Sequence, residues 1–259
     1  MADDVDWRRY DRQVRFAPLG MRGQKALRLA SALIVGVGGL GSWMAELLAR
    51  AGVGMVRLVD GDVVDLTNIH RQGLYDEADA GKRKVHAAAE RLSRVNSQVR
   101  VEPMAEVLTP HNIERLAAGV NAILDGTDNF QVRFVINDFA VKTNMPWVFA
   151  GAIGAEGQVM PVVPGQTACL RCIFDSPPPP CVEPTCRVAG VLGPPVAAIA
   201  AIAACEAVKI LAGNLDAVSG HLVKLDFWTN TIQRIDAASA ARAVNCPCCK
   251  QRRFEYLES

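Results

Sequence analysis

A run of glycines lies between two apolar segments near the start of the chain, and an acid closes the second segment. Residues 33–60 read LIVGVGGLGSWMAELLARAGVGMVRLVD, in which the first glycines are Gly36, Gly38, Gly39 and Gly41. Glycine lets the backbone turn tightly and lets phosphate oxygens approach the N–H groups at a helix start, where the helix dipole favours negative charge. Asp60, about 20 residues past the loop, is then placed to accept hydrogen bonds from ribose hydroxyls. The stretch predicts a nucleotide site.

Polar and basic residues after Asp60 bear on which nucleotide is bound. They are Asn68, Arg71 and Gln72 in a loop, then Lys82, Arg83 and Lys84 in the first turn of a helix predicted to start near Gly81. Cations at a helix N-terminus oppose the macrodipole, a local conflict that is typical of functional sites. The glycine pattern alone also fits an NAD-dependent oxidoreductase. Hydride transfer has no need of these cations, whereas a triphosphate does.

A second polar cluster follows a later buried strand. The strand at residues 122–125 ends in DGTDN, which places Asp125, Asp128 and Asn129 at its carboxyl end. Ligands of an open parallel sheet bind at that edge. We therefore expect these side chains to face the same nucleotide.

Two pairs of cysteines have the spacing of a zinc site. They are Cys169 with Cys172, and Cys246 with Cys249. Each Cys-x-x-Cys pair can hold one side of a tetrahedral zinc, and four thiolates leave no open position for water, so the predicted zinc is structural. It would attach the C-terminal tail to the loop after the sheet. Cys248 is an alternative to Cys249, with a shorter spacing.

The remaining cysteines have different settings. Cys205 falls within an apolar helical pattern and is predicted to be core. Cys181 and Cys186 flank a proline-rich loop, and Arg187 next to Cys186 favours the thiolate. Such a thiolate can reach a reactive acyl group; the alternative is a loop cysteine without a role.

The elements between these motifs indicate an α/β fold. Apolar runs alternate with helical patterns up to residue 154, among them a predicted strand at 99–107 and a predicted helix at 111–119. This alternation implies a Rossmann-like, mostly parallel sheet with helices on both faces. A strand pair is predicted at 221–227 and 231–235, turning at Thr229 and Asn230. We expect one domain over residues 1–259. Its parts are an arm and helix (1–30), a nucleotide-binding half (31–154) and a second half (155–259) with a crossover loop (173–190) and a zinc-binding tail.

Composition excludes several classes. With 259 residues, 50% of them hydrophobic, the chain can bury a sizeable core, and a net charge of +1 provides no general attraction for nucleic acid or an acidic membrane. The start, MADDVDWRRYDRQVRF, is too charged for a signal peptide, so a cytoplasmic protein is expected. The apolar run at 188–205 is rich in alanine, is interrupted by glycine and proline, and predicts a buried helix rather than a membrane span.

Taken together, these motifs resemble a known family. They are RYDRQ at 9–13, GVGGLGS at 36–42, VDGDVVDLTNIHRQ at 59–72, GKRK at 81–84, DGTDN at 125–129, the two cysteine pairs, and CRVAGVLGPPV at 186–196. In this order they resemble the ubiquitin-activating-enzyme-like adenylyltransferases, the ThiF/MoeB/HesA family, over nearly the whole chain. Members join ATP to the C-terminal carboxylate of a small ubiquitin-like protein ending in Gly-Gly, releasing pyrophosphate and leaving an acyl-adenylate.

The resemblance implies roles and partners. Gly39 lies against the nucleotide, Asp60 holds the ribose, and the phosphates are contacted by Asn68, Arg71 and Lys84. Gln72 lines the site and Asp128 holds magnesium. The family is homodimeric, and Arg12 in the arm would reach the ATP of the partner subunit.

The surroundings of Cys186 resemble the sulfur-carrier branch of the family. In that branch this cysteine takes the activated carboxylate or relays sulfur as a persulfide. Prolines at 177–180 and at Pro195 depart from the pattern. No rhodanese-like sulfurtransferase domain follows in the sequence, so sulfur is expected from a separate sulfurtransferase or from sulfide.

Three other hypotheses remain open. One is an NAD-dependent oxidoreductase. The second is a relative that adenylates another acceptor, such as a tRNA nucleoside or a peptide, although the near-neutral charge argues against tRNA. The third is a non-catalytic module, against which Arg71, Lys84 and Asp128 argue. The resemblance leaves several carriers open, since thiamine, molybdenum cofactor, tRNA thiolation, cysteine and natural-product pathways all use such activators.

Overall fold

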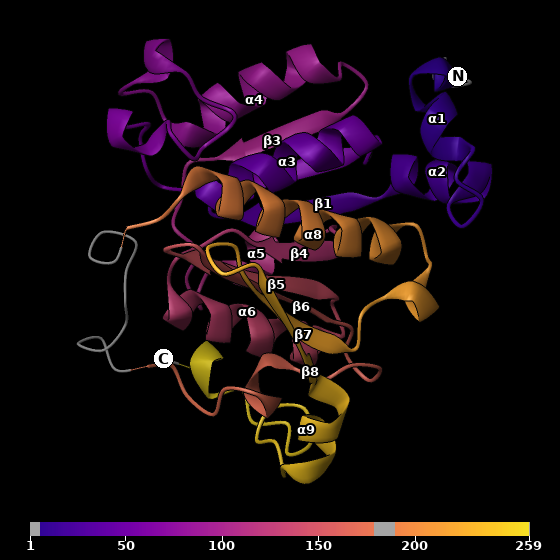
Figure 1. Cartoon of the computed structure of the whole chain (residues 1–259), viewed down its shortest axis with the longest axis vertical. Coiled ribbons are helices and arrows are strands. Elements are labelled where there is room, and N and C mark those ends of the chain that lie inside the picture. Colours follow the sequence, from indigo (N-terminus) through magenta and orange to yellow (C-terminus); the bar gives the residue numbers. More distant parts are fainter. Residues whose placement is uncertain (1–5, 179–189, 259) are drawn as a thin grey trace.

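A single sheet of eight strands runs through the protein (Figure 1). The computed structural model describes residues 6–178 and 190–258. The strand order is β3-β2-β1-β4-β5-β6-β7-β8. The strands are β1 Ser31–Val35, β2 Met55–Val59, β3 Arg100–Met104, β4 Ala122–Asp125, β5 Trp147–Ile153, β6 Glu156–Val162, β7 His221–Asp226 and β8 Thr231–Asp236.

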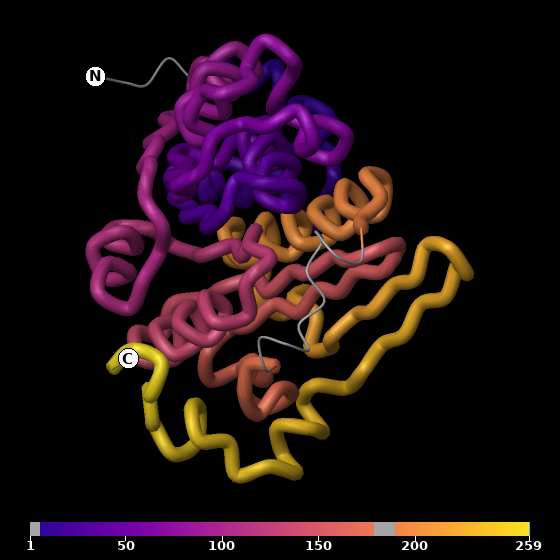
Figure 2. The backbone as a smooth tube through the Cα atoms, turned by 90° about the vertical axis from the view of Figure 1, so that its left-hand side faces the viewer, coloured from indigo at the N-terminus to yellow at the C-terminus, as the bar shows by residue number. Residues whose placement is uncertain are grey.

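Strand direction divides the sheet at β5. The pairings β3-β2, β2-β1, β1-β4 and β4-β5 are parallel, and those from β5 to β8 are antiparallel. Four buried residues of β4 and four of β1 explain the near-continuous apolar runs, since a central parallel strand is covered on both faces. All six residues of β8 are exposed, because β8 is the edge strand (Figure 2). The prediction of a mostly parallel sheet with a C-terminal strand pair is confirmed.

Helices cover both faces of the sheet, each over its own core. They are α1 Asp11–Val14, α2 Gly20–Leu29, α3 Gly39–Ala51, α4 Lys84–Val95, α5 Ile113–Leu116, α6 Phe130–Thr143, α8 Gly193–Leu211 and α9 Ala237–Ala243. One core joins α3, α4 and α8 to the sheet through residues such as Met44, Leu92 and Ile199. The other joins α5 and α6 to the opposite face through Leu116 and Phe134. The predicted helices on both faces are confirmed.

The apolar run predicted as a buried helix forms α8. Pro194 and Pro195 occupy the first turn, where a missing N–H costs no helical hydrogen bond. Within the described residues α8 is long and apolar enough to cross a membrane, but it packs against α3 and the sheet, and Ile199 and Ala203 are fully buried. Cys205, predicted to be core, is exposed on the outer side of the helix. That prediction is wrong because α8 buries one face rather than its whole circumference.

The N-terminal arm is attached to the C-terminal end of α3. The side chain of Gln13 donates to the carbonyl of Ala51 over 2.9 Å, and Asn96 bonds both Tyr10 Oη and the carbonyl of Ala49 over 2.8 Å. Because the glycine-rich loop lies at the other end of this 13-residue helix, the arm and the loop are about 20 Å apart along it. Figure 1 shows this separation.

Three predicted element boundaries need correction. The helix predicted from Gly81 begins at Lys84, because Arg83 is extended in an isolated bridge with Val63. The strand predicted at 99–107 is limited to β3, and the helix predicted at 111–119 is limited to α5. Gly119, at a φ of 75°, belongs to the turn that leads to β4.

We expect Gly41→Ala to destabilise the fold. A Cβ at this position would overlap the backbone carbonyl oxygen of Gly36, which no side-chain rotation relieves. The free energy of unfolding should fall by about 3 kcal/mol or more, measured by urea denaturation. Gly220→Ala is the matched control, because its Cβ would meet no atom within 4 Å. Equal stability of the two variants would contradict the proposed packing.

Candidate active site and metal centre

The glycine-rich loop is held by close backbone contacts at the carboxyl end of β1. Gly36 has a φ of 79°, and its N–H donates to the carbonyl of Val59 over 2.7 Å. Gly41 and Gly126 both pack directly on the Gly36 carbonyl, where a Cβ would not fit. Gly38 and Gly39 open helix α3 as N-cap and first residue. No side chain of Gly38 or Gly39 itself therefore lies between a ligand and the first N–H groups of this helix.

Asp60 lies at the end of β2, beside that loop. Its carboxylate accepts hydrogen bonds from the Val37 amide over 2.7 Å and from the Asp62 amide over 2.8 Å. Tyr75 donates its hydroxyl to the Val37 carbonyl over 2.8 Å, and burial raises the pKa of Tyr75. These bonds hold the acid against the loop, with its remaining lone pairs available to a hydroxyl donor.

Lys84 lies next to Asp60, as the sequence predicted for a shared site. Its ammonium is 2.9 Å from the Asp62 carboxylate and 4.0 Å from that of Asp60, and its side chain is 7% exposed. The other two predicted cations turn elsewhere. Lys82 pairs with Asp79, and Arg83 donates to the Gly61 carbonyl. Only Lys84 of the three can therefore oppose charge on a nucleotide here.

Arg71 and Gln72 flank the start of α3 from the opposite side. The aliphatic part of Arg71 and the side chain of Val196 on α8 both lie next to Gly39. Gln72 is 3% exposed and lies beside Gly38, and its Oε1 has no hydrogen-bond partner among the described residues. A buried amide oxygen without a partner costs free energy, which a bound ligand can recover.

Asn68 makes hydrogen bonds within the loop that carries Arg71 and Gln72. Its carbonyl accepts from the amides of Arg71 and Gln72 over 3.1 and 3.2 Å. Its side-chain amide donates to the Thr67 hydroxyl over 3.3 Å. The residue is half-buried. Its predicted contact with phosphate stays a prediction.

The residues of the DGTDN motif have different surroundings: Asp125 is buried, whereas Asp128 and Asn129 are exposed. Asp125 is fully buried and accepts from Arg133 Nε over 2.8 Å and from Thr127. Burial raises the pKa of Asp125, and the Arg133 guanidinium and the Thr127 hydrogen bonds oppose that rise. Asn129 is the N-cap of α6, where it accepts from the amides of Gln131 and Val132. Asp128 is exposed beside them.

Arg133 is a residue of this site that sequence reasoning missed. Its guanidinium lies over the rings of Phe130 and Phe149, 4.7 and 5.2 Å from their centroids, and it donates to the Ala150 carbonyl. In the sequence it occupies an ordinary helical position, and only an acid eight residues earlier, Asp125, signals a partner. It also lines a cavity of about 230 Å³.

That cavity extends from the nucleotide edge of the sheet to its antiparallel half. Its lining residues are Asp128, Phe130, Arg133, Gly151, Ala152, Ile153, Glu156, Gly157, Gln158 and Lys224. Gly151 on β5 and Gly157 on β6 line it without side chains, and its lining also includes Lys224 and Glu156, which form an ion pair of 2.6 Å. A second cavity, of about 290 Å³, lies beyond Arg71 between Trp43 and Pro194. The first cavity is lined by both charged and apolar side chains.

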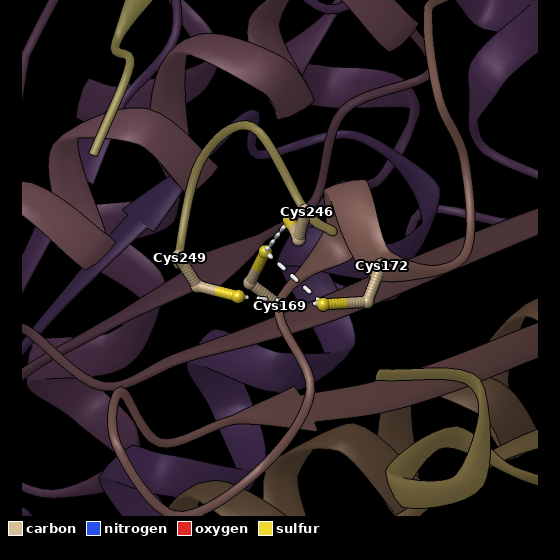
Figure 3. Close-up of side chains that lie close together, drawn as sticks. All are labelled: Cys169, Cys172, Cys246 and Cys249. Atoms are coloured by element: carbon tan, nitrogen blue, oxygen red, sulfur yellow. Dashed lines mark hydrogen bonds between the residues drawn. The ribbon is translucent and has the colours of Figure 1, made fainter. Parts of the chain in front are cut away.

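Four cysteine sulfurs converge as a metal site (Figure 3). Cys169, Cys172, Cys246 and Cys249 have their Sγ atoms all within 4.8 Å of one another. The contacts of Cys169 with Cys172 and Cys246 are 3.8 and 3.5 Å. A tetrahedral zinc with Zn–S bonds of about 2.3 Å requires S–S edges of about 3.8 Å, so the donor set fits zinc. Contact with the neighbouring thiols, first of all Cys172, raises the pKa of Cys169.

The choice between Cys248 and Cys249 is decided by this geometry. The sulfur of Cys249 is 3.5 Å from that of Cys172, within the cluster. The sulfur of Cys248 is fully buried against Asn137, whose amide lies 3.3 Å away. Cys249 therefore completes the cluster, as the sequence favoured.

The structure does not bring Arg12 to the nucleotide site within one chain. Arg12 is on the arm, its side chain 85% exposed and 4.0 Å from Asp11, at the far end of α3. Cys186, like Cys181, lies outside the described residues.

Comparison with known proteins places this site in a family. The model of the ThiF family matches residues 10–248. The chain belongs to the ThiF family. Its fold is also that of Escherichia coli MccB solved with MccA-N7isoASN, at a TM-score of 0.82 and 22% identity over 93% of this chain and 74% of that one.

Curated members of the ThiF family include close relatives. The sulfur carrier protein ThiS adenylyltransferase of Bacillus subtilis is 39% identical over 96% of this chain and 73% of that protein. The sulfur carrier protein adenylyltransferase of Thermus thermophilus is 37% identical over 93% of this chain and 90% of that protein. The adenylyltransferase and sulfurtransferase MOCS3 of Sus scrofa is 40% identical over 94% of this chain, which spans about half, 53%, of MOCS3.

We expect Cys246→Ser to remove the metal and loosen the tail. The variant should lose bound zinc, and its Tm should fall by roughly 10 °C, because metal binding energy stabilises the folded state. Elemental analysis and thermal unfolding measure both effects. Cys205→Ser is the control, since Cys205 is exposed on α8 and outside the cluster. Full zinc content in the Cys246 variant would show that another set of ligands holds the metal.

Proposed function

We propose that this chain uses ATP to adenylate the C-terminal Gly-Gly carboxylate of a small ubiquitin-like sulfur-carrier protein. The reaction releases pyrophosphate and prepares the carrier for thiocarboxylate formation. The observation that carries the proposal is the convergence of the glycine-rich helix start, Asp60, Lys84 and Arg71 at one edge of the sheet. The names of the two sulfur-carrier adenylyltransferases, similar over more than nine-tenths of this chain, support it.

The charges of the site suit the chemistry. A carboxylate oxygen attacks the α-phosphorus, and the bond from that phosphorus to the oxygen bridging the β-phosphate breaks. Both reactants are anionic, so cations near the phosphates lower the barrier, and positioning accounts for much of the rest. In this proposal Arg71 and Lys84 neutralise the phosphates, the α3 amides bind them, and Asp60 orients the ribose.

Magnesium would be held by Asp128. Its carboxylate is exposed at the carboxyl end of β4, and an oxygen ligand is what magnesium prefers. When bound, the ion neutralises charge on the phosphates and on pyrophosphate. Asn129 contributes by capping α6, which fixes the backbone next to Asp128.

The carrier tail would lie in the cavity beside Asp128. The cavity begins at that residue and ends at Lys224 and Glu156, so a tail lying along it meets the nucleotide edge with its carboxylate. The volume of about 230 Å³ admits only a narrow chain, and Gly151 and Gly157 line it without side chains that would fill it. A Gly-Gly end fits this restriction better than a bulkier one.

The proposal also covers the oligomeric state, the role of Cys186, the location of the protein and the division of its domain. A homodimer would let Arg12 of one subunit reach the ATP of the other, since Arg12 is exposed and far from its own loop. Cys186 would take the activated carboxylate or relay sulfur from a sulfurtransferase partner. A cytoplasmic location agrees with carriers and sulfur donors that are themselves soluble. We place the nucleotide half at 31–154 and the carrier half at 155–259 of one domain.

ATP–pyrophosphate exchange tests the proposal directly. We expect exchange with magnesium and at least one member of a panel of small carrier proteins that end in Gly-Gly. The same carriers without their last glycine serve as controls and should support none. Tight ATP binding without exchange on any carrier would refute carrier adenylation and favour a different acceptor or a silent module.

A matched pair of lysines tests the role of the site. Lys84→Ala should lower the exchange rate by about 100-fold, because a buried cation near the phosphates is lost. Lys82→Ala removes the same charge two residues away, where the lysine pairs with Asp79 at the surface, and should change the rate less than about twofold. Similar losses in both variants would contradict the assignment of Lys84 alone.

A further inference from the structure

The segment after β2 is hydrogen-bonded to the segment before α4. The Val64 amide donates to the Lys82 carbonyl over 2.8 Å, and the Lys84 amide donates to the Asp62 carbonyl over 3.1 Å. These bonds fix the backbone of Lys84 beside the nucleotide edge. The final position of its ammonium then depends on the acceptors around it.

Two carboxylates surround that ammonium in different ways. Asp62 is 2.9 Å away and Asp60 is 4.0 Å away. The Asp60 carboxylate already accepts two backbone N–H groups and is 9% exposed. The Asp62 carboxylate is 72% exposed, and Lys84 is its hydrogen-bond partner in the described part of the chain.

Removing the Asp62 charge would leave Lys84 one nearby carboxylate, that of Asp60. A buried ammonium without a charged partner is costly, so the lysine would move onto Asp60. A carboxylate oxygen of Asp60 would then accept a hydrogen bond from Lys84 in place of one from a ribose hydroxyl. Lys84 would also be drawn away from the phosphates.

We propose that Asp62 is a positioning residue that holds the Lys84 ammonium off Asp60. Asp60 is thereby kept free for the ribose, and Lys84 is kept facing the phosphates. This inference rests on the proposed function, because it assumes that a nucleotide binds at Asp60. It adds a residue whose own carboxylate contacts neither ribose nor phosphate.

Ribose discrimination tests this role. Equilibrium binding of ATP and of 2′,3′-dideoxy-ATP, which lacks both ribose hydroxyls, is measured with magnesium for wild type and for Asp62→Asn. Wild type should bind ATP about tenfold more tightly than the dideoxy nucleotide. Asp62→Asn should bind both nucleotides more weakly than wild type, because Lys84 leaves the phosphates, and should bind ATP within about twofold of the dideoxy nucleotide, so that ribose discrimination disappears.

Two further variants separate positioning from general effects. In a Lys84→Ala background, Asp62→Asn should have no further effect on ribose discrimination, because Asp62 acts through that lysine. Glu90→Gln removes the same charge from a surface pair with Arg94 on α4 and should retain wild-type discrimination. Thermal unfolding of each variant confirms that the fold is intact.

Several results would overturn the inference. Asp62→Asn with wild-type discrimination would show that Asp60 stays free without it. Tighter binding of both nucleotides would show that Asp62 withholds Lys84 from the phosphates. Wild type that binds both nucleotides equally would refute the ribose contact while leaving adenylation untouched, whereas wild type that binds neither would refute the proposed function as well.

Discussion

The close packing of three backbone segments around the carbonyl of Gly36 is the contact on which the site depends. Gly41 from α3 and Gly126 from the end of β4 both approach this oxygen more closely than any residue with a Cβ could. The contact places the helix start directly over the carboxyl ends of β1 and β4. The Val37 amide then meets Asp60, so loop, helix and acid form one unit. A shift of any of the three segments would separate the predicted phosphate and ribose contacts.

Charge balance within this unit is almost complete before any ligand binds. The Lys84 ammonium lies between two carboxylates, and Arg133 lies against a third, Asp125. Such pairing keeps buried charges tolerable, since each alone would cost several kcal/mol, on the order of the whole stability of a domain. Arg71 is the cation at the helix start that lacks a carboxylate partner among the described ion pairs. An arriving triphosphate therefore meets unpaired positive charge at Arg71 and the helix dipole, in addition to the paired ammonium of Lys84.

Local patterns were sufficient to predict most of the fold. Apolar runs predicted the central parallel strands β1 and β4, because these strands are covered on both faces and are apolar almost throughout. The cysteine spacing predicted the metal cluster, since Cys-x-x-Cys geometry is set within four residues. Where the start of α4 was misjudged, the reason is non-local: an isolated bridge from Val63 holds Arg83 extended, which no window around Gly81 contains.

The candidate site was predicted less completely than the fold for the same reason. The glycines and Asp60 were found because strand ends meet at one edge of a parallel sheet, and Lys84 was found because a cation at a helix start opposes the macrodipole. Arg133 was not found, because its burial comes from aromatic rings and an acid on different elements. Asn129 was assigned to the nucleotide, yet its side-chain oxygen caps α6, a role that depends on where the helix starts.

Arg133 also connects the two halves of the sheet. One edge of its guanidinium binds Asp125 at the parallel side, and the other donates to Ala150 on β5, where the antiparallel half begins. The same group lines the cavity proposed for the carrier tail. Attack by a carboxylate requires its oxygen about 3 to 3.5 Å from the α-phosphorus, so tail and nucleotide must be held in one frame. The four-cysteine cluster stabilises the far end of that frame by attaching the C-terminal tail beside α6. In the proposed reaction, the carrier tail and the nucleotide are then aligned by the hydrogen bonds through which Arg133 links β4 to β5, rather than by any single contact with substrate.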